Sequence, residues 1–327
     1  MVVIFVRSWE TQVLNVGWSM CCLVIFFHYL ASSYDFVAPN FQPPMNVLQL
    51  PNLCWVALSN NPFLAGISDE TEYDLQVIED PILEQDHWPI LGQGAGGITR
   101  KVNWNGRWVA VKTFAGELTS DGSPQDERAI SVAAAKSFAG SQQQQQQHPC
   151  TISLLGQTQT TNALIMEYLD GYTALAGPPS FETCSRDVYG PLELNWNQTV
   201  WIVQGLLEVL IQLHSKGICH GDFYAHNILL SSSGDNVKLS DFGAAFFYDT
   251  TAPYADWIQK IELRAFGILV EELHDMLLNR CSDQLQQQNY TVLMDLAKSC
   301  NDPTIRTFQQ LYEGYSKLLV QRNVYKA

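Results

Sequence analysis

The chain has 327 residues, of which 46% are hydrophobic and 16% charged, so it is long enough for two ordinary globular domains. Its formal net charge of -15 argues against nucleic acid and anionic membrane surfaces as partners, because both would repel it. The eight cysteines are scattered without a Cys-x-x-Cys pair. We therefore expect reduced thiols in a cytoplasmic protein.

Residues 1–43 contain a largely apolar stretch from Val13 to Ala31. A helix that spans a membrane needs about 20 apolar residues, and Asn15 and His28 interrupt this stretch. Three interpretations stay open: a membrane anchor, which would change the expected localisation, a helix packed on the rest of the protein, or an extension introduced by gene prediction.

Residues 44–66 space their leucines in the manner of a single leucine-rich repeat. Asn61 would bond the backbone of the turn. One repeat cannot bury its apolar face alone, so we expect it to lean on the N-terminal segment or on the following domain. An acidic linker is predicted over residues 67–85. The inward-facing positions of the repeat would be Leu48, Leu50, Leu53 and Leu58.

A glycine-rich stretch follows the linker and contains Gly92, Gly94 and Gly97. Glycines at such a turn let backbone amides approach phosphate groups, because no side chain intervenes. The β-branched run Trp108-Val-Ala-Val-Lys then predicts a strand that ends in Lys112.

A helix is predicted over residues 124–138, and its first turn carries Asp126 and Glu127. Negative charge there suits the helix dipole, which is a sufficient structural reason for both residues. A glutamine run at residues 142–147 predicts a flexible loop, and a strand is expected over residues 163–168.

Three oxygen-bearing side chains gather in the stretch from His220 to Gly243. Asp222 and Asn227 share one loop, and a hairpin over residues 228–240 should bring Asp241 beside them. Two of the three could hold magnesium on nucleotide phosphates while the third faces an attacking hydroxyl. Apolar residues between Thr199 and Lys216 recur at helical spacing and predict a supporting helix.

The C-terminal third is predicted to be mainly helical, beginning with a helix over residues 261–279. Near the start of that helix, Glu262-Leu-Arg-Ala-Phe-Gly resembles the buried helix that protein kinases open with an acidic residue. The resemblance implies that the Glu262 carboxylate caps backbone amides of the loop that carries Asp222. The sequence Cys300-Asn-Asp-Pro-Thr-Ile-Arg leads into the last helix and includes Arg306.

These motifs resemble the protein kinases. The pattern His-x-Asp-x-x-x-x-Asn, with Asp-Phe-Gly beginning fourteen residues after the Asn, is similar to their catalytic and metal loops. The resemblance implies an α+β, two-lobed domain over residues 86–327, preceded by a short leucine-rich-repeat remnant. A small β-rich N-lobe would cover residues 86–166, a hinge residues 167–170, and a mainly helical C-lobe residues 171–327.

The resemblance also implies site roles, with ATP and Mg²⁺ as cofactors and a protein of unknown identity as substrate. Glu127 would pair with Lys112, with Asp126 as the fallback. The implied catalytic residues are Asp222, Lys112, Glu127 and Asn227. The implied magnesium ligands are Asn227 and Asp241. The implied nucleotide contacts are Gly92, Gly94, Gly97, Ala110 and Lys112, with the backbone of Glu167 and Leu169.

A narrower resemblance is to leucine-rich-repeat protein kinases with compact catalytic domains. It rests on Thr119-Ser-Asp-Gly-Ser-Pro-Gln-Asp-Glu, on the stretch from Gly177 to Tyr189, and on His220-Gly-Asp-Phe-Tyr-Ala-His-Asn. Gly221 departs from the arginine usual in kinases, which makes control by activation-loop phosphorylation an unfavoured hypothesis. Tyr224 and His226 match neither the serine/threonine nor the tyrosine pattern, so that choice stays open.

The segment between Asp241 and Glu262 is the most unusual part of the domain. It has only twenty residues and no Ala-Pro-Glu, so the platform for a peptide substrate is reduced. An active protein kinase is the favoured hypothesis. An ATP-binding pseudokinase scaffold and a small-molecule phosphotransferase with the same fold are the alternatives.

Overall fold

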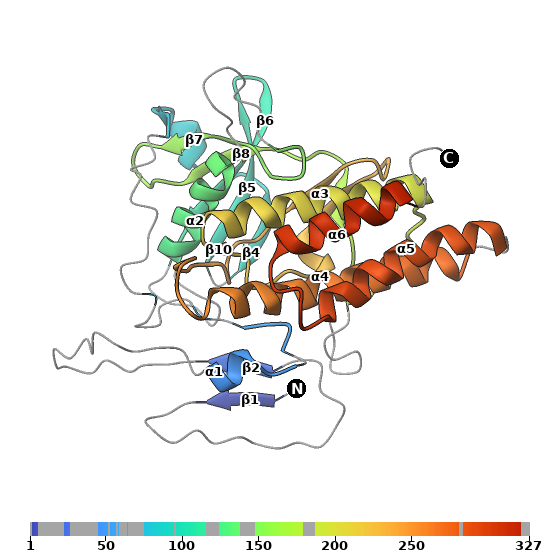
Figure 1. Cartoon of the computed structure of the whole chain (residues 1–327). Helices are drawn as coiled ribbons and strands as arrows, with labels where there is room; N and C mark the ends of the chain where they lie inside the picture. The colour runs from blue at the N-terminus through green and yellow to red at the C-terminus, as the bar shows by residue number, and fades with distance from the viewer. Residues whose placement is uncertain are drawn as a thin grey trace.

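The computed structural model describes residues 2–5, 23–26, 45–51, 53–56, 58, 64, 75–94, 96–115, 124–137, 148–178, 187–280 and 284–321. Within them a β-sheet with one helix forms a small lobe, and a larger, mainly helical lobe follows it (Figure 1). This arrangement agrees with the predicted two-lobed α+β architecture. The glutamine run and residues 179–186 lie outside the described residues.

The small lobe is built on a six-stranded sheet in the order β3-β7-β8-β6-β5-β4. Only β3 and β7 pair in parallel, and the other neighbours are antiparallel. Asn105 and Gly106 join β5 to β6 with positive φ angles of 52° and 80°, as a two-residue hairpin turn requires. The strands are β3 (Val77–Ile78), β4 (Ile90–Gly94), β5 (Gly97–Trp104), β6 (Arg107–Phe114), β7 (Leu154–Thr158) and β8 (Leu164–Glu167). The helix of this lobe is α2 (Pro124–Ser137).

Part of the segment for which a linker was predicted is structured. Strand β3 pairs with β7, and the short 3-10 helix η2 (Pro81–Glu84) packs beside it. Ile78 and Leu83 are buried in the core of the small lobe, and the Trp104 indole donates to Asp80 at 3.1 Å. These apolar contacts explain why residues 77–84 pack on the small lobe and are not part of a linker, despite the acidic composition of the segment.

The larger lobe is organised around α3 (Trp196–Ser215) and α4 (Ala255–Leu278), with α5 (Gln284–Asn301) and α6 (Phe308–Gln321) packed on them. Asn195 and Gln198 form a capping box that begins α3. The predicted apolar stripe of α3 is buried, and its members are Ile202, Val203, Leu206, Leu207, Leu210 and Leu213. Helix α4 begins before the predicted helix, because Ala255 and Ile258 also find apolar partners.

The larger lobe also contains two small sheets of short strands. The hairpin predicted after the Asp222 loop is present as β11 (Ile228–Ser231) and β12 (Val237–Leu239), and β9 (Tyr172–Ala174) pairs on its other side. Strand β10 (Ile218–Cys219) pairs with β13 (Phe246–Phe247). The four cysteines in the described residues, Cys54, Cys150, Cys219 and Cys300, are buried free thiols, as expected.

The N-terminal part contributes β1 (Val2–Phe5), β2 (Leu23–Phe26) and α1 (Met45–Leu48), and α1 lies below α4 in Figure 1. Among the described residues no helix is both long and apolar enough to cross a membrane. Most of the stretch from Val13 to Ala31 lies outside them.

The segment 45–64 is called the strap below, and its described residues, 45–51, 53–56, 58 and 64, include leucines that pack on the large lobe, as the leaning repeat was expected to do. Leu48, Leu53 and Leu58 are buried as predicted. The prediction for Leu50 was wrong, since its side chain is 38% exposed. The described residues of the strap after α1 form no strand, so no strand directs the Leu50 side chain inward. Asn61 lies outside the described residues.

Candidate active site

The glycine stretch forms the hairpin of β4 and β5. Gly97 has a φ of 151°, and a Cβ there would lie 2.1 Å from the Thr113 carbonyl oxygen, so only glycine fits. Gly92 and Gly94 have no atom within 4 Å of an added Cβ. The backbone of β4 is therefore open to a ligand at these two positions, as the phosphate-loop interpretation requires.

Lys112 on β6 forms an ion pair with Glu127 on α2. The Glu127 side chain is 4% exposed, and burial raises its pKa against the opposing effect of the Lys112 ammonium. The charge of Asp241 also raises the pKa of Glu127, which places Asp241 within electrostatic reach of the pair. The structure thus joins Lys112 to Glu127 and leaves Asp126 out of that ion pair.

Asp222 and Asn227 lie together in the loop that precedes β11. The Asn227 amide nitrogen donates to the Asp222 carboxylate at 2.8 Å and to its backbone carbonyl at 2.9 Å. Burial opposes ionisation of Asp222, but hydrogen bonds and charge from His226 outweigh it, and the pKa of Asp222 is lowered. A carboxylate held ionised in this way can accept a proton.

His226 is a site residue that the sequence interpretation left without a role. Its Nδ1 donates to Asp187 Oδ1 at 2.9 Å, and its Nε2 lies 3.7 Å from Asp222 Oδ2. Burial works against the charged ring, but the two carboxylates prevail and raise the pKa of His226 to about 9. Asp187, in a stretch whose role the sequence did not reveal, thereby helps to fix the position of Asp222.

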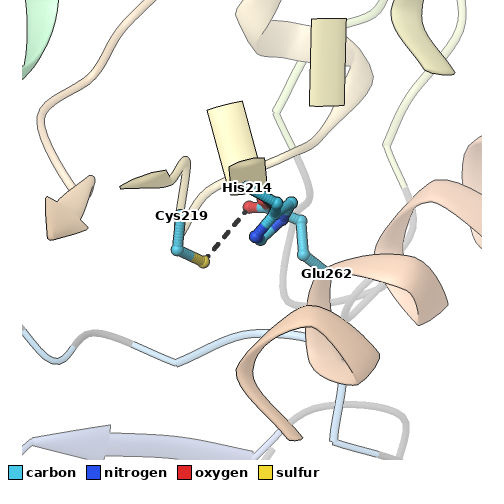
Figure 2. A group of neighbouring side chains, drawn as sticks. All are labelled: His214, Cys219 and Glu262. Carbon is cyan, nitrogen blue, oxygen red and sulfur yellow. Dashed lines mark hydrogen bonds and ion pairs between the residues drawn. The ribbon is translucent and has the colours of Figure 1, made fainter. Parts of the chain in front are cut away.

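Glu262 of α4 holds the Asp222 loop from beneath, as predicted. Its carboxylate accepts from the backbone amides of His220 at 3.2 Å and Gly221 at 2.8 Å. Figure 2 shows its side chain converging with His214 and Cys219, which donate at 2.7 and 3.5 Å. These bonds engage both carboxylate oxygens, so the group acts as a hydrogen-bonded brace for the loop.

The backbone at Gly221 explains why glycine stands where kinases usually have arginine. Its φ is 77°, and a Cβ at this position would lie 2.3 Å from the Ala244 carbonyl oxygen. Any side chain, an arginine included, would force the two backbones apart. The Asp222 loop therefore approaches the segment after Asp241 so closely that only glycine fits at position 221.

Asp241 follows β12 and is exposed, with a φ of 56° that is uncommon for a residue other than glycine. Gly243 donates its backbone N–H to Asp241 Oδ1 at 3.1 Å. The preceding Ser240 donates its N–H and its hydroxyl to the Asn227 carbonyl at 2.9 and 2.8 Å. These bonds hold Asp241 beside the loop of Asp222 and Asn227.

The donor set suits magnesium. The Asn227 amide nitrogen faces Asp222, so its oxygen is the atom that could bind an ion, and Asp241 adds a carboxylate. Oxygen donors of this kind are those that Mg²⁺ prefers. A bound Mg²⁺ would neutralise phosphate charge.

The connection between the lobes contains the remaining predicted nucleotide contacts. The Glu167 carboxylate accepts from Lys238 at 2.9 Å and from the Ser153 amide at 2.8 Å, so its side chain fixes the connection to the large lobe. Ala110 is buried on β6 opposite Met166 of β8. Leu169 follows β8 at the crossing. Lys238, also missed by the sequence interpretation, anchors this hinge.

A nucleotide held between the lobes would meet open backbone of the glycine hairpin on one side and oxygen ligands on the other. The paired Lys112 would lie between these two groups. This geometry defines a class of protein: a two-lobed phosphotransferase of the protein kinase type.

The comparison with protein families identifies the family. The family described as protein kinase domain matches residues 86–272, which is more than half of the chain. The chain therefore belongs to the protein kinase domain family.

Individual relatives match shorter parts. The serine/threonine-protein kinase US3 homolog of Gallid herpesvirus 2 (strain GA) is 49% identical over 59 residues, which are 18% of this chain and 14% of the relative. Human mitogen-activated protein kinase kinase kinase 7 is 27% identical over 161 residues, 48% of this chain and 23% of the relative. A Dictyostelium discoideum protein, seven transmembrane domain-containing tyrosine-protein kinase 1, is 28% identical over 162 residues, which are 47% of this chain and 21% of the relative. The chain thus spans less than a quarter of the length of each of these relatives.

Proposed function

We propose that this chain is an active, Mg²⁺-dependent protein kinase that transfers the γ-phosphoryl group of ATP to a protein hydroxyl. The observation that supports this most is the Asp222 carboxylate, which Asn227 holds in the same loop and whose pKa His226 lowers. The acceptor hydroxyl would give its proton to Asp222 as its oxygen bonds to the γ-phosphorus. The bond from that phosphorus to the bridging oxygen breaks, and ADP leaves with the electron pair.

The other residues position the reactants. Lys112, aimed by Glu127, would bind the α- and β-phosphates, and the glycine hairpin would cover them. Asn227 and Asp241 would hold Mg²⁺, and the backbone from Glu167 to Leu169, with Ala110, would bind adenine. Whether the acceptor is serine, threonine or tyrosine stays open, since the relatives above carry both designations.

We also propose membership of the subgroup of leucine-rich-repeat kinases with compact catalytic domains. The support is the three shared stretches in the sequence and the buried leucines of the strap. A second candidate function is an ATP-binding pseudokinase scaffold, because Trp55 of the strap is bonded to Asp222.

The experiment that separates the two candidates is transfer of radiolabelled phosphate from ATP to casein by the full chain, beside Asp222→Asn. An active kinase should lose turnover by a factor of about 10² or more in the variant, the scale of general-base catalysis. Binding of Mg-ATP should be retained. Binding of Mg-ATP without transfer, both in the unmodified chain and in Trp55→Ala, which frees Asp222 from the strap, would favour the scaffold.

A further inference from the structure

The strap reaches the residue on which the proposed chemistry depends. The Trp55 indole nitrogen donates to Asp222 Oδ1 at 2.9 Å, across 167 residues of sequence. Asn227 donates to the other carboxylate oxygen at 2.8 Å. An acceptor hydroxyl must donate to this carboxylate before it can transfer its proton. The indole N–H occupies the position at Oδ1 from which such a hydroxyl would donate.

Hydrogen bonds anchor the strap immediately before Trp55 in the chain. Arg264 of α4, whose side chain is buried, donates from one nitrogen to the carbonyls of Leu50 and Leu53, both at 2.9 Å. The Cys54 thiol lies 3.9 Å from the Tyr224 hydroxyl, next to the Asp222 loop. Because the backbone carbonyls are bound directly, the strap crosses this surface in a fixed register.

Apolar packing holds the strap on the segment that follows Asp241 and on the start of α4. The buried cluster joins strap residues to Cys219, Phe246, Tyr248, Tyr254, Ala255, Ile258 and Ile261. The strap members of the cluster are Leu48, Leu53, Val56, Leu58 and Leu64. The chain between Asp241 and α4 is short, and the strap covers the surface beside it.

We propose that the strap is an internal pseudosubstrate, which occupies the acceptor surface and places Trp55 where the acceptor side chain would meet Asp222. This inference rests on the proposed function and adds to it. The acceptor is an extended, apolar peptide that displaces the strap, with its hydroxyl residue in place of Trp55. The chain in the described conformation is therefore self-inhibited toward protein acceptors but open to Mg-ATP.

The first test measures phosphate transfer to casein by the full chain and its Trp55→Ala and Trp55→Phe variants. Trp55→Ala should raise kcat/KM for casein at least about tenfold, the factor expected when one hydrogen bond to a carboxylate is removed. Trp55→Phe, which removes the N–H but keeps ring bulk, should lie between. The KM for ATP should stay within about twofold, because the nucleotide contacts are untouched.

Trp201→Ala is the matched control, since Trp201 is exposed on α3 and is not a member of the buried cluster that joins the described strap residues to the large lobe. It should behave like the unmodified chain. An unchanged or lower rate for Trp55→Ala, with Mg-ATP binding intact, overturns the inference: an unchanged rate means that Trp55 blocks nothing, and a lower rate that it assists Asp222.

The second test needs no turnover. In the full chain with Leu53→Asp and Leu58→Asp, the strap should detach, because two buried side chains become charged. A labelled peptide of residues 45–64 should then bind, and the same peptide with Trp55→Ala should bind at least about tenfold more weakly. Fluorescence anisotropy measures both.

The outcomes are distinct. Equal binding of the two peptides, or no binding of either, overturns the pseudosubstrate inference whatever the transfer assay gives. Absence of label on casein with every variant, while Mg-ATP still binds, contradicts the proposed catalytic function alone. The peptide result then decides whether Trp55 recognises the Asp222 surface.

Discussion

At the scale of single residues, the identity of the acid that pairs with Lys112 decides how the small lobe binds phosphate. Two neighbouring acids begin α2, and both have a raised pKa because burial disfavours their charged forms. Only Glu127 forms an ion pair with Lys112. A lysine held by a buried carboxylate is fixed in direction, which is what positioning of a phosphate requires.

We predict that Glu127→Gln lowers kcat/KM for ATP by about tenfold or more, because the lysine loses the charge that aims it. Asp126→Asn is the matched control at the adjacent position and should change the same constant by less than about twofold. Initial rates at varied ATP give both values. A larger effect at Asp126 than at Glu127 would show that the wrong acid has been assigned.

Asp241 differs from these acids because its side chain is exposed and forms no ion pair with another described residue. We expect Asp241→Ala to abolish most of the magnesium dependence of nucleotide binding, because a carboxylate ligand is lost. Asp235→Ala, in the exposed turn between β11 and β12, is the control. Titrations of ATP with and without Mg²⁺ measure the difference, and an unaltered magnesium response would exclude Asp241 as a ligand.

At the scale of elements, the β4–β5 hairpin combines two opposite requirements. Its backbone has to be bare at Gly92 and Gly94, where an added Cβ meets nothing, and tightly packed at Gly97, where it meets the Thr113 carbonyl. Gly96 adds a third constraint, since a Cβ there would lie 2.7 Å from Glu127 Oε2. The same glycine stretch therefore serves both ligand access and close packing.

We predict that Gly97→Ala destabilises the chain by roughly 1–3 kcal/mol, the range for a strained backbone position, because of its positive φ and the clash with β6. Gly92→Ala should change the free energy of unfolding by less than about 1 kcal/mol. Urea denaturation of both variants measures these values. Equal stabilities would mean that the backbone of β5 adjusts without cost.

At the scale of the whole molecule, His226 joins Asp187, which precedes α3 in the chain, to Asp222 in the loop before β11. Its pKa in the folded chain is about 9, above the value of about 6.5 in an unfolded chain. The folded state therefore binds the proton more tightly. This contribution to stability is complete below pH 6.5 and is lost as pH rises through 9.

The free energy of unfolding should thus fall by up to about 3 kcal/mol between pH 6.5 and 10 from this group. His226→Asn should lack that decline, and subtracting its curve removes the contributions of other titrating groups. Urea denaturation in EDTA, without nucleotide, measures both. Parallel curves for the two proteins would contradict the assigned ion pairs.

The sequence predicted those parts of the molecule whose signals are local. The α3 stripe follows from periodicity and the β11–β12 hairpin from its turn residues. The capping of the Asp222 loop by Glu262 follows from the resemblance of the start of α4 to a kinase helix. Lys112 and Glu127 also came together as the motif implied. In each case the deciding residues are near one another in sequence or belong to a pattern of fixed spacing.

The contacts that the sequence did not reveal join distant segments. The bond from Trp55 to Asp222 and the bonds from Arg264 to the strap depend on tertiary packing, which no local pattern encodes. Asp187 and His226 look like ordinary polar residues until the loop places them together. The need for Gly221 became apparent only from its closeness to Ala244.

The central claim is that Asp222 is the base of an active kinase. Its most direct measurement is transfer of radiolabelled phosphate to casein by the full chain and by Trp55→Ala, each beside the same protein with Asp222→Asn. We predict label in both backgrounds that falls about 10²-fold or more with Asp222→Asn, while Mg-ATP affinity is kept. Label that persists with Asp222→Asn, or its absence in both backgrounds despite bound Mg-ATP, would contradict the account.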